Sequence, residues 1–311
     1  MAAVDSFHLL YRQVSRSCGG YVEGLALLGA LYAASKAALA ARGAYRLLRL
    51  HFLPRLVKNR DLVRCYGRWA LVSGASGTVV KAYAEELARH GVSIIILSPD
   101  IGSLSGTATA ISESHGVDAV LVEVDFSHGP SVCRSVQDAI RDRDVGFVVN
   151  GLDAGLDVPH DFAELSEGWL WDVVTRATAA ATLVTRLALP GMVARRRGAV
   201  VNISSGASCR PGLKRATLSA STAFLEHFSR ALHHEYGGRG IFVQSVTPLH
   251  VAARAGTGSW LAPDGRVYAR HAVSTLGICH RTTGYWPHAL QAGLARWMPE
   301  WMWVTGSRLL A

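Results

Sequence analysis

The sequence predicts an α/β fold built around a doubly wound parallel sheet, with an N-terminal helical extension. Short apolar runs rich in β-branched residues, such as Val92–Leu97, alternate with longer segments of helical character. A glycine-containing turn follows the first of these runs, Trp69–Ser73. The chain of 311 residues is long enough for one large α/β domain, and its charged fraction of 18% fits strands that are buried on both faces.

Six apolar runs are predicted to form the strands: Trp69–Ser73, Val92–Leu97, Ala119–Val124, Gly146–Asn150, Gly198–Ile203 and Ile241–Val246. Helices are expected over Tyr83–His90, Ser166–Leu189 and residues 215–237. The pair Pro190-Gly191 is expected to end the second of these helices. Because strands and helices alternate along the chain, the sheet is expected to be parallel.

Residues 1–60 differ in composition from residues 61–311, and the two segments are predicted to be separate domains. The first segment carries nine basic and two acidic groups, a net charge of +7 out of +9 for the chain. Its apolar stretch Tyr21–Ala40 is about long enough to cross a bilayer, although Glu23 and Lys36 interrupt it. An arginine-rich, acid-poor segment is typical of mitochondrial transit sequences and of helices on membrane surfaces. The alternative is a pair of ordinary helices packed on the main domain.

Composition also excludes several classes of function. No basic stripe with interleaved aromatic residues occurs after residue 60, so no nucleic-acid partner is expected. The five cysteines are scattered without close pairs, which predicts neither a disulfide framework nor a metal site. The C-terminal region contains a cluster of tryptophans, which fits either a core or a membrane interface: Trp286, Trp297, Trp301 and Trp303.

Several short motifs follow the predicted strands in order. They are Val124-Asp-Phe126, Val148-Val-Asn150, Leu189-Pro-Gly-Met192 and Gly198-Ala-Val-Val-Asn-Ile-Ser-Ser205. With the glycine turn before them, this order resembles the short-chain dehydrogenase/reductase family over about residues 66 to 290. Three stretches resemble its branch of steroid and 3-oxoacyl-CoA reductases: Lys81–Ala88, Phe228–Leu232 and Thr282–Trp286. The chain most resembles an inactive member of that branch, including its first seven residues, Met-Ala-Ala-Val-Asp-Ser-Phe.

The resemblance implies a nucleotide site at the turn Ser73-Gly-Ala-Ser-Gly-Thr-Val-Val80. The family pattern there is Thr-Gly-x-x-x-Gly-x-Gly, whose glycines allow a tight turn, close approach of the pyrophosphate, and helix–strand packing. Gly74 is in place, but Thr78 and Val80 stand at the second and third glycine positions. Thr78 is expected to push against a ligand, and Val80 is expected to crowd the contact between helix and strand. The alternative is that this is a plain strand-to-helix turn.

The rest of the implied cofactor site is also altered. Pro99 and Asp100 follow the second strand, where related NADPH enzymes have an arginine for the 2′-phosphate. Asp125 matches the family residue that meets the adenine, and Asn150 is all that remains of an Asn-Asn-Ala-Gly motif. Gly74, Asp125 and Asn150 are therefore predicted to be the remnant of an NADP(H) site, and no bound cofactor is expected.

The resemblance also implies a catalytic set, and most of it is absent. The family uses a serine, a tyrosine thirteen residues later, a lysine four residues beyond that, and an asparagine on the preceding long helix. The matching positions here are Ser205, Leu218, Thr222 and Ala177. A tyrosine needs a neighbouring cation to ionise near neutral pH, and leucine has no proton to give. No catalytic residue is therefore predicted, and Ser205 is vestigial.

These observations predict a catalytically inactive protein that acts as a scaffold through protein contacts. Residues 1–60 are expected to deliver it to, or hold it at, a mitochondrial membrane. One alternative is a residual NADP(H)-dependent oxidoreductase acting on a steroid or 3-oxoacyl-CoA carbonyl. Another is a protein of the endoplasmic-reticulum membrane, anchored through residues 21–40 and the tryptophan-rich C-terminus.

Overall fold

The computed structural model describes the chain except for residues 1, 53–60, 153–158, 207–212, 255 and 311. The chain divides into two compact units, residues 1–52 and 53–311, which are described separately below. Residue 60, where the sequence placed its domain boundary, lies outside the described residues.

The N-terminal unit is one helix, α1 (Ala2–His51). Its segment Tyr21–His51 is long and apolar enough to cross a membrane, and the side chains of its most apolar stretch are exposed. Leu25, Leu28 and Leu31 are among these exposed side chains. The alternative of a pair of helices is therefore wrong, because the apolar stretch and the arginine-rich stretch belong to one continuous helix.

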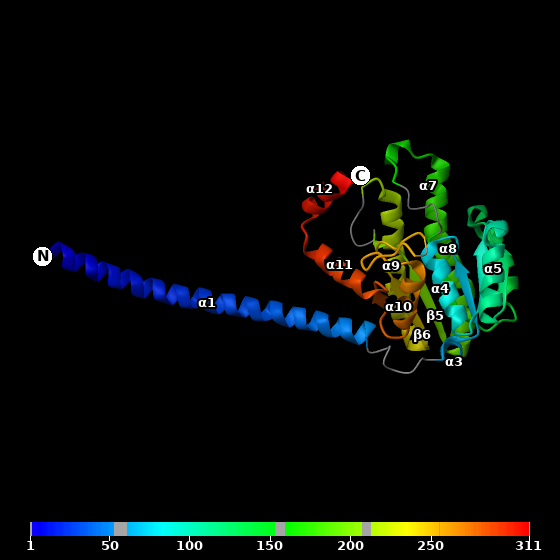
Figure 1. The fold of residues 1–311 in the computed structure, drawn as a ribbon, viewed down its shortest axis with the longest axis horizontal. Coiled ribbons are helices and arrows are strands. Elements are labelled where there is room, and N and C mark those ends of the chain that lie inside the picture. Colours follow the sequence, from blue (N-terminus) through cyan, green and yellow to red (C-terminus); the bar gives the residue numbers. More distant parts are fainter. Residues whose placement is uncertain (1, 53–60, 153–158, 207–212, 255, 311) are drawn as a thin grey trace. The chain divides into compact units, whose positions relative to one another are not determined.

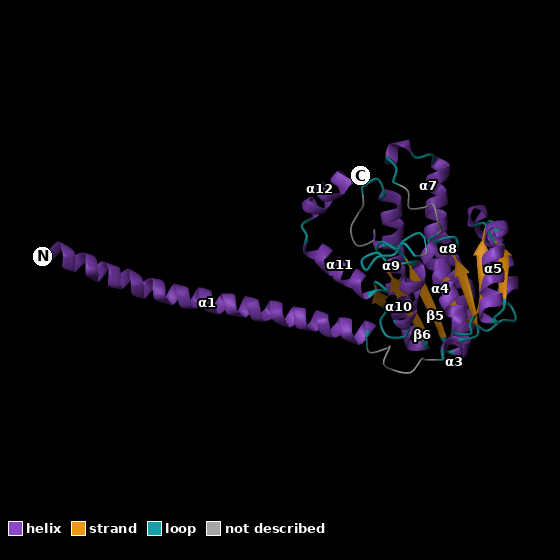
Figure 2. Cartoon of the chain, in the orientation of Figure 1, coloured by secondary structure: helices purple, strands orange, loops and turns teal. Residues whose placement is uncertain are grey.

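The second unit contains a seven-stranded sheet in the order β3-β2-β1-β4-β5-β6-β7 (Figures 1 and 2). All neighbouring strands are parallel, as the sequence predicts. The strands are β1 (Trp69–Ser73), β2 (Ser93–Ser98), β3 (Ala119–Glu123), β4 (Val145–Asn150), β5 (Gly198–Ile203), β6 (Ile241–Val246) and β7 (Arg281–Thr282). Strand β7 was not predicted from the sequence, because its two residues are too few to show a pattern.

Helices cover both faces of this sheet. The helices described in this unit are α3 (Leu62–Tyr66), α4 (Thr78–Arg89), α5 (Ile101–His115), α6 (Cys133–Ile140), α7 (Glu167–Val174), α8 (Ala180–Arg195), α9 (Ala216–Tyr236), α10 (Gly265–Ser274), α11 (Trp286–Trp297) and α12 (Glu300–Leu310). The predicted end at Pro190 is wrong, because α8 continues to Arg195 and Met192 is fully buried beneath the sheet. A left-handed residue, Arg196, ends the helix instead.

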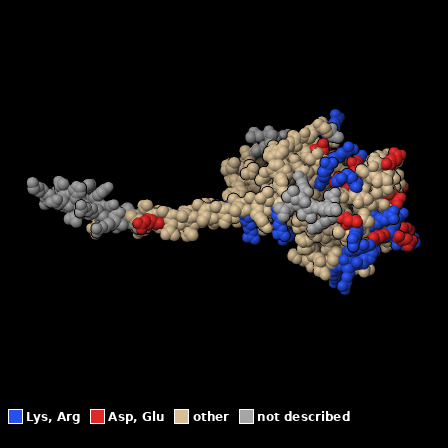
Figure 3. Space-filling view, turned by 60° about the horizontal axis from the view of Figure 1, so that its bottom comes forward, with Lys and Arg blue, Asp and Glu red and all other residues tan. Residues whose placement is uncertain are grey.

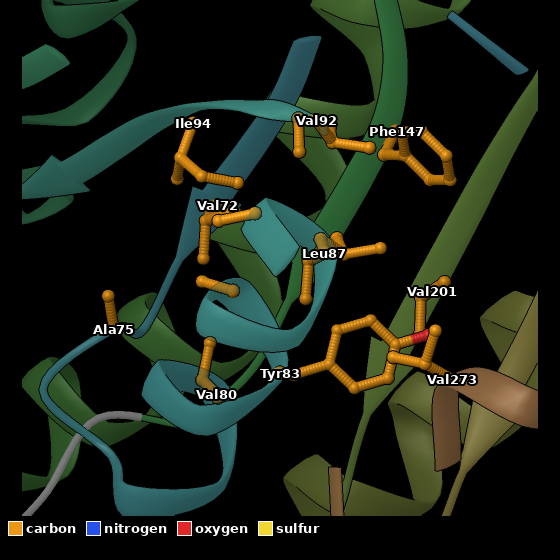
Figure 4. Packing of buried hydrophobic residues seen from close by; sticks show 14 of the residues in the cluster. Val72, Ala75, Val80, Tyr83, Leu87, Val92, Ile94, Phe147, Val201 and Val273 are labelled. Atoms are coloured by element: carbon orange, nitrogen blue, oxygen red, sulfur yellow. The ribbon is translucent and has the colours of Figure 1, made fainter. Parts of the chain in front are cut away.

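Two apolar clusters hold the helices on the sheet, and alternate residues of each strand belong to opposite clusters. Ala70 and Val72 of β1 lie in the cluster that α4, α5 and α10 cover, whereas Leu71 lies in the cluster beneath α6, α8 and α9. Figure 4 shows part of the first cluster, where Val80 and Tyr83 of α4 lie against the sheet. This arrangement places the carboxyl ends of β1 and β4 side by side at the centre of one edge of the sheet.

Candidate cofactor and catalytic site

The candidate site lies where β1 and β4 end. The strand order reverses between these two strands, and in open parallel sheets ligands bind in the crevice at such a point. Ser73 and Asn150 are paired in the register of β1 and β4. The next residue along, Gly151, donates its backbone N–H to the carbonyl oxygen of Ser73 over 3.1 Å. The turns after the two strands are therefore in direct contact.

Both glycines of the β1–α4 turn are needed by this contact. Gly74 has φ +80°, and a β-carbon built on it would stand 2.6 Å from the carbonyl carbon of Gly151. A β-carbon on Gly77, the N-cap of α4, would overlap the carbonyl oxygen of Leu152. The packing of the two turns therefore requires glycine at both positions.

Val80 fills space at the same contact. Its side chain is 2% exposed and belongs to the core cluster under α4. A β-carbon on Gly151 would overlap Cγ2 of Val80. The family motif has its second asparagine at position 151, where this chain has a glycine. Because Gly151 has no side chain, Val80 fits at the contact between helix and strand without the crowding that the sequence predicted. Thr78, in contrast, is exposed in the first turn of α4.

Asn150 is buried and its hydrogen bonds are made within the protein. Its amide nitrogen donates to Oδ1 of Asn202 (2.8 Å) and Oγ1 of Thr185 (3.0 Å). Its carbonyl oxygen accepts from Oγ of Ser73 at 3.3 Å. Asn202 continues the network by donating to Oγ of Ser229 on α9 at 2.8 Å. The network of these side chains therefore joins three strands and two helices.

Asp125 lies just beyond β3, at the far end of the candidate nucleotide crevice. It lines a cavity with Ser73, Gly74, Pro99 and other residues, and the space in this cavity is about 10 Å³, no more than one water needs. Partial burial alone would raise the pKa of the Asp125 carboxyl, but hydrogen bonds from Ser127 and the nearby His128 hold it below its usual value. Asp100 caps α5 by accepting from the backbone N–H of Ser103 at 3.2 Å.

The catalytic positions lie on three elements. Ser205 follows β5, and Leu218 and Thr222 share a buried face of α9. The Thr222 hydroxyl is 0% exposed and donates to the carbonyl oxygen of Ser219, one turn back in the same helix, at 3.0 Å. Ala177 is buried in a π-helical turn between α7 and α8. Such turns are frequent at functional sites, but the methyl group of alanine can neither donate nor accept a proton.

A larger cavity, which the sequence did not predict, lies beside Leu218. It has a volume of about 130 Å³ and is formed by two separate segments, His160–Trp169 and Lys214–Leu218. Lys214 is the one lysine near the catalytic positions in sequence, and its Nζ lies 3.2 Å from a carboxylate oxygen of Asp161. Lys214 therefore pairs with an acid outside α9 and does not occupy the missing lysine position.

No metal site is present in the part of the chain that the structure describes. No group of three or more histidine, cysteine or acidic residues there is arranged to hold an ion. Cys65, Cys133 and Cys279 are free thiols.

Comparison with known proteins extends these observations. A family described as short chain dehydrogenase matches residues 68–260. An inactive hydroxysteroid dehydrogenase-like protein 1 from Danio rerio is 56% identical, over 99% of this chain and 98% of that protein. The protein of the same name from Homo sapiens is 48% identical, over 100% and 96%. A very-long-chain 3-oxoacyl-CoA reductase from Mus musculus is 34% identical, over 87% and 88%.

Solved structures agree on the fold. A 7β-hydroxysteroid dehydrogenase superposes with a TM-score of 0.70 at 22% identity, over 80% of this chain and 99% of that one. A short-chain dehydrogenase from Sphingobium yanoikuyae, solved with NADPH, gives a TM-score of 0.58 at 25% identity, over 66% and 82%. The fold and the resemblance inferred from the motifs are thus confirmed.

Proposed function

Because the chain belongs to the short-chain dehydrogenase family, we propose that it is a catalytically inactive member, a pseudoenzyme that acts through protein contacts. The observation that carries this proposal is the buried face of α9. Where the family has its tyrosine and lysine, this face presents Leu218 and Thr222. General acid catalysis contributes about 10²–10⁴-fold to a rate. This chain lacks both the tyrosine that would act as the acid and the lysine whose charge would activate it. The relatives named inactive, at 48% and 56% identity, support the same conclusion.

The residues at the β1–β4 crevice do not fit NADP(H). Val80 occupies the contact where the family has its third glycine, and the hydrogen bonds of Asn150 go to neighbouring side chains. The cavity beside Asp125 has space for about one water molecule, at about 10 Å³. Pro99 lines that cavity and offers no charge for a phosphate. As cofactor ligands, Gly74, Asp125 and Asn150 are then vestigial. Each of them contributes to the fold of this chain.

A titration of the full-length chain with NADPH tests this proposal. We expect no saturable heat of binding in calorimetry up to millimolar cofactor, for NADPH or for NADH. Micromolar affinity for either nucleotide would overturn the assignment of a closed cofactor crevice. An active short-chain dehydrogenase titrated under the same conditions is the positive control.

A residual oxidoreductase is the rival function, and the 34% identity to a very-long-chain 3-oxoacyl-CoA reductase favours it. It requires a proton donor other than residues 205, 218 and 222. NADPH-dependent reduction of a steroid ketone or a 3-oxoacyl-CoA, above the rate without protein, would support the rival and contradict the proposal.

The place of action that we propose is a mitochondrial membrane. Support comes from the arginine-rich, acid-poor composition of residues 1–60 and from the exposed apolar segment Tyr21–His51. Residues 1–60 fused to a fluorescent protein test this placing. We expect the fusion to overlap a mitochondrial marker, and a reticular pattern would instead support the endoplasmic reticulum.

A further inference from the structure

Helices α11 and α12 present a row of large apolar side chains to solvent. Leu290, Leu294 and Trp297 follow at the four- and three-residue steps that place side chains on one face of a helix. Leu294, Trp297 and Trp301 are 73%, 71% and 69% exposed. The C-terminal apolar face is the set of six exposed side chains Leu290, Leu294, Trp297, Met298, Trp301 and Met302.

The opposite side of α11 fixes the orientation of this face. His288 is 0% exposed, and its Nδ1 accepts from the backbone N–H of Leu249 at 3.3 Å while Nε2 contacts the carbonyl oxygen of His250 at 3.1 Å. Gln291 donates to the carbonyl oxygen of Leu261 at 3.0 Å. Leu290, Leu294 and Trp297 are therefore carried by a helix that is anchored to the domain.

The chemistry of the face matches a bilayer interface. Tryptophan combines a large apolar ring with a polar N–H and is enriched where lipid meets water. Residues 286–310 contain one acidic residue, Glu300, and two arginines, Arg296 and Arg308. In Figure 3 the charged side chains of the described residues gather mainly on one side of the domain. A group of large, exposed apolar side chains such as this one marks an interaction site.

A membrane would also be within reach of this domain. Only eight residues separate Phe52, just after α1, from Asp61, and a connection of this length spans at most about 30 Å. An α1 helix inserted in a bilayer would hold the domain near its surface and raise the effective concentration of lipid around it. At this raised concentration, an apolar face that binds membranes too weakly by itself would dock on the bilayer.

We propose that the C-terminal apolar face docks on the surface of the lipid bilayer that α1 enters. This inference rests on the membrane placing proposed above. It assigns Trp297 and Trp301 to the lipid interface, where their rings enter the headgroup region.

The distribution of tryptophan provides a direct test. All eight tryptophans lie after residue 60, so quenching of their emission by lipid reports on the domain and not on α1. The full-length chain is reconstituted into vesicles of brominated phosphatidylcholine and, in parallel, of ordinary phosphatidylcholine. We expect bromine to quench the wild-type emission, and the double variant Trp297→Gln/Trp301→Gln to lose about half or more of the quenched signal. Trp171→Gln is the matched control, because Trp171 is equally exposed, at 68%, but lies on α7.

The outcomes separate the docking face from the anchoring by α1. Vesicle flotation without bromine quenching would overturn the docking face while leaving the anchoring by α1 intact. Failure to float would overturn both. If the double variant instead separates a dimer into monomers in detergent and quenching is unchanged, the face contacts a second copy of the chain. None of these results depends on whether NADPH binds.

Discussion

The side chain of Val80 on α4 occupies the space that a β-carbon at residue 151, after β4, would need. The overlap is with Cγ2 of Val80, whereas Cβ of Val80 would lie 3.4 Å from the added atom, an ordinary contact. The two residues are thus complementary: the valine at the family's third glycine position is accommodated because residue 151 has no side chain. Both stand at the point of the sheet where relatives of this fold bind a nucleotide.

This complementarity predicts coupled stability. Gly151→Ala is expected to lower the free energy of unfolding by about 1–3 kcal/mol, because the new methyl group meets Val80. Val80→Ala removes two buried carbons and should cost about 2 kcal/mol. The double variant should cost less than the sum of the two, with a coupling of about 0.5–3 kcal/mol in urea denaturation. Gly106→Ala, at an open position within α5, is the control and should be neutral or slightly stabilising. Simple additivity would contradict the contact.

Asn150 is predicted to stabilise the fold and not to bind a ligand. Asn150→Ala leaves Asn202, Thr185 and Ser73 without a partner that each has in the native protein. We expect a loss of about 2–3 kcal/mol or more in thermal or urea unfolding, since buried polar groups lose their hydrogen bonds. Gln291→Ala, which removes an exposed hydrogen bond of a side-chain amide, should change stability by less than about 0.5 kcal/mol. Equal effects of the two changes would contradict the network.

Restoring the family residues on α9 should not create an enzyme. In Leu218→Tyr/Thr222→Lys, the new ammonium group would enter a position that is 0% exposed, and burying an unpaired charge costs several kcal/mol. We expect a lower melting temperature and no NADPH-dependent reduction of a steroid ketone. Ala220→Lys, on the exposed side of the same helix, should leave stability nearly unchanged. Turnover by the double variant would show that nucleotide still binds.

His288 predicts a pH dependence of stability. Burial lowers the pKa of its imidazole to about 4, although the carbonyl oxygen of His250 favours the proton. An unfolded histidine has a pKa near 6.5, so between about 6.5 and 4 the unfolded chain binds more protons than the folded one. The contribution of neutral His288 is therefore complete above pH 6.5 and is lost as the pH falls toward 4.

The melting temperature measured from pH 7.5 to 4 checks this prediction. The wild-type protein should lose stability across the window with a slope from this group of up to about 1.4 kcal/mol per pH unit. His288→Gln should be less stable at pH 7.5 and should depend less on pH. His227→Gln, at an exposed histidine of α9, should follow the wild-type curve. Parallel curves for wild type and His288→Gln would refute the assignment.

The sequence by itself determined the parallel sheet, the position of its longer strands, and the loss of the tyrosine and lysine. These follow from apolar runs and from residue identity, which are local properties. It did not show that α8 continues through Pro190, because the burial of Met192 that favours the extra turn is a tertiary contact. It predicted crowding at Val80 and missed the matching Gly151, because the two residues are 71 positions apart and meet only when β1 and β4 pair. Asn150 likewise looks like the remnant of a binding motif until folding brings its side chain into contact with that of Asn202. Only the tertiary structure decided that the Asn150 amide finds its hydrogen-bond partners within the protein.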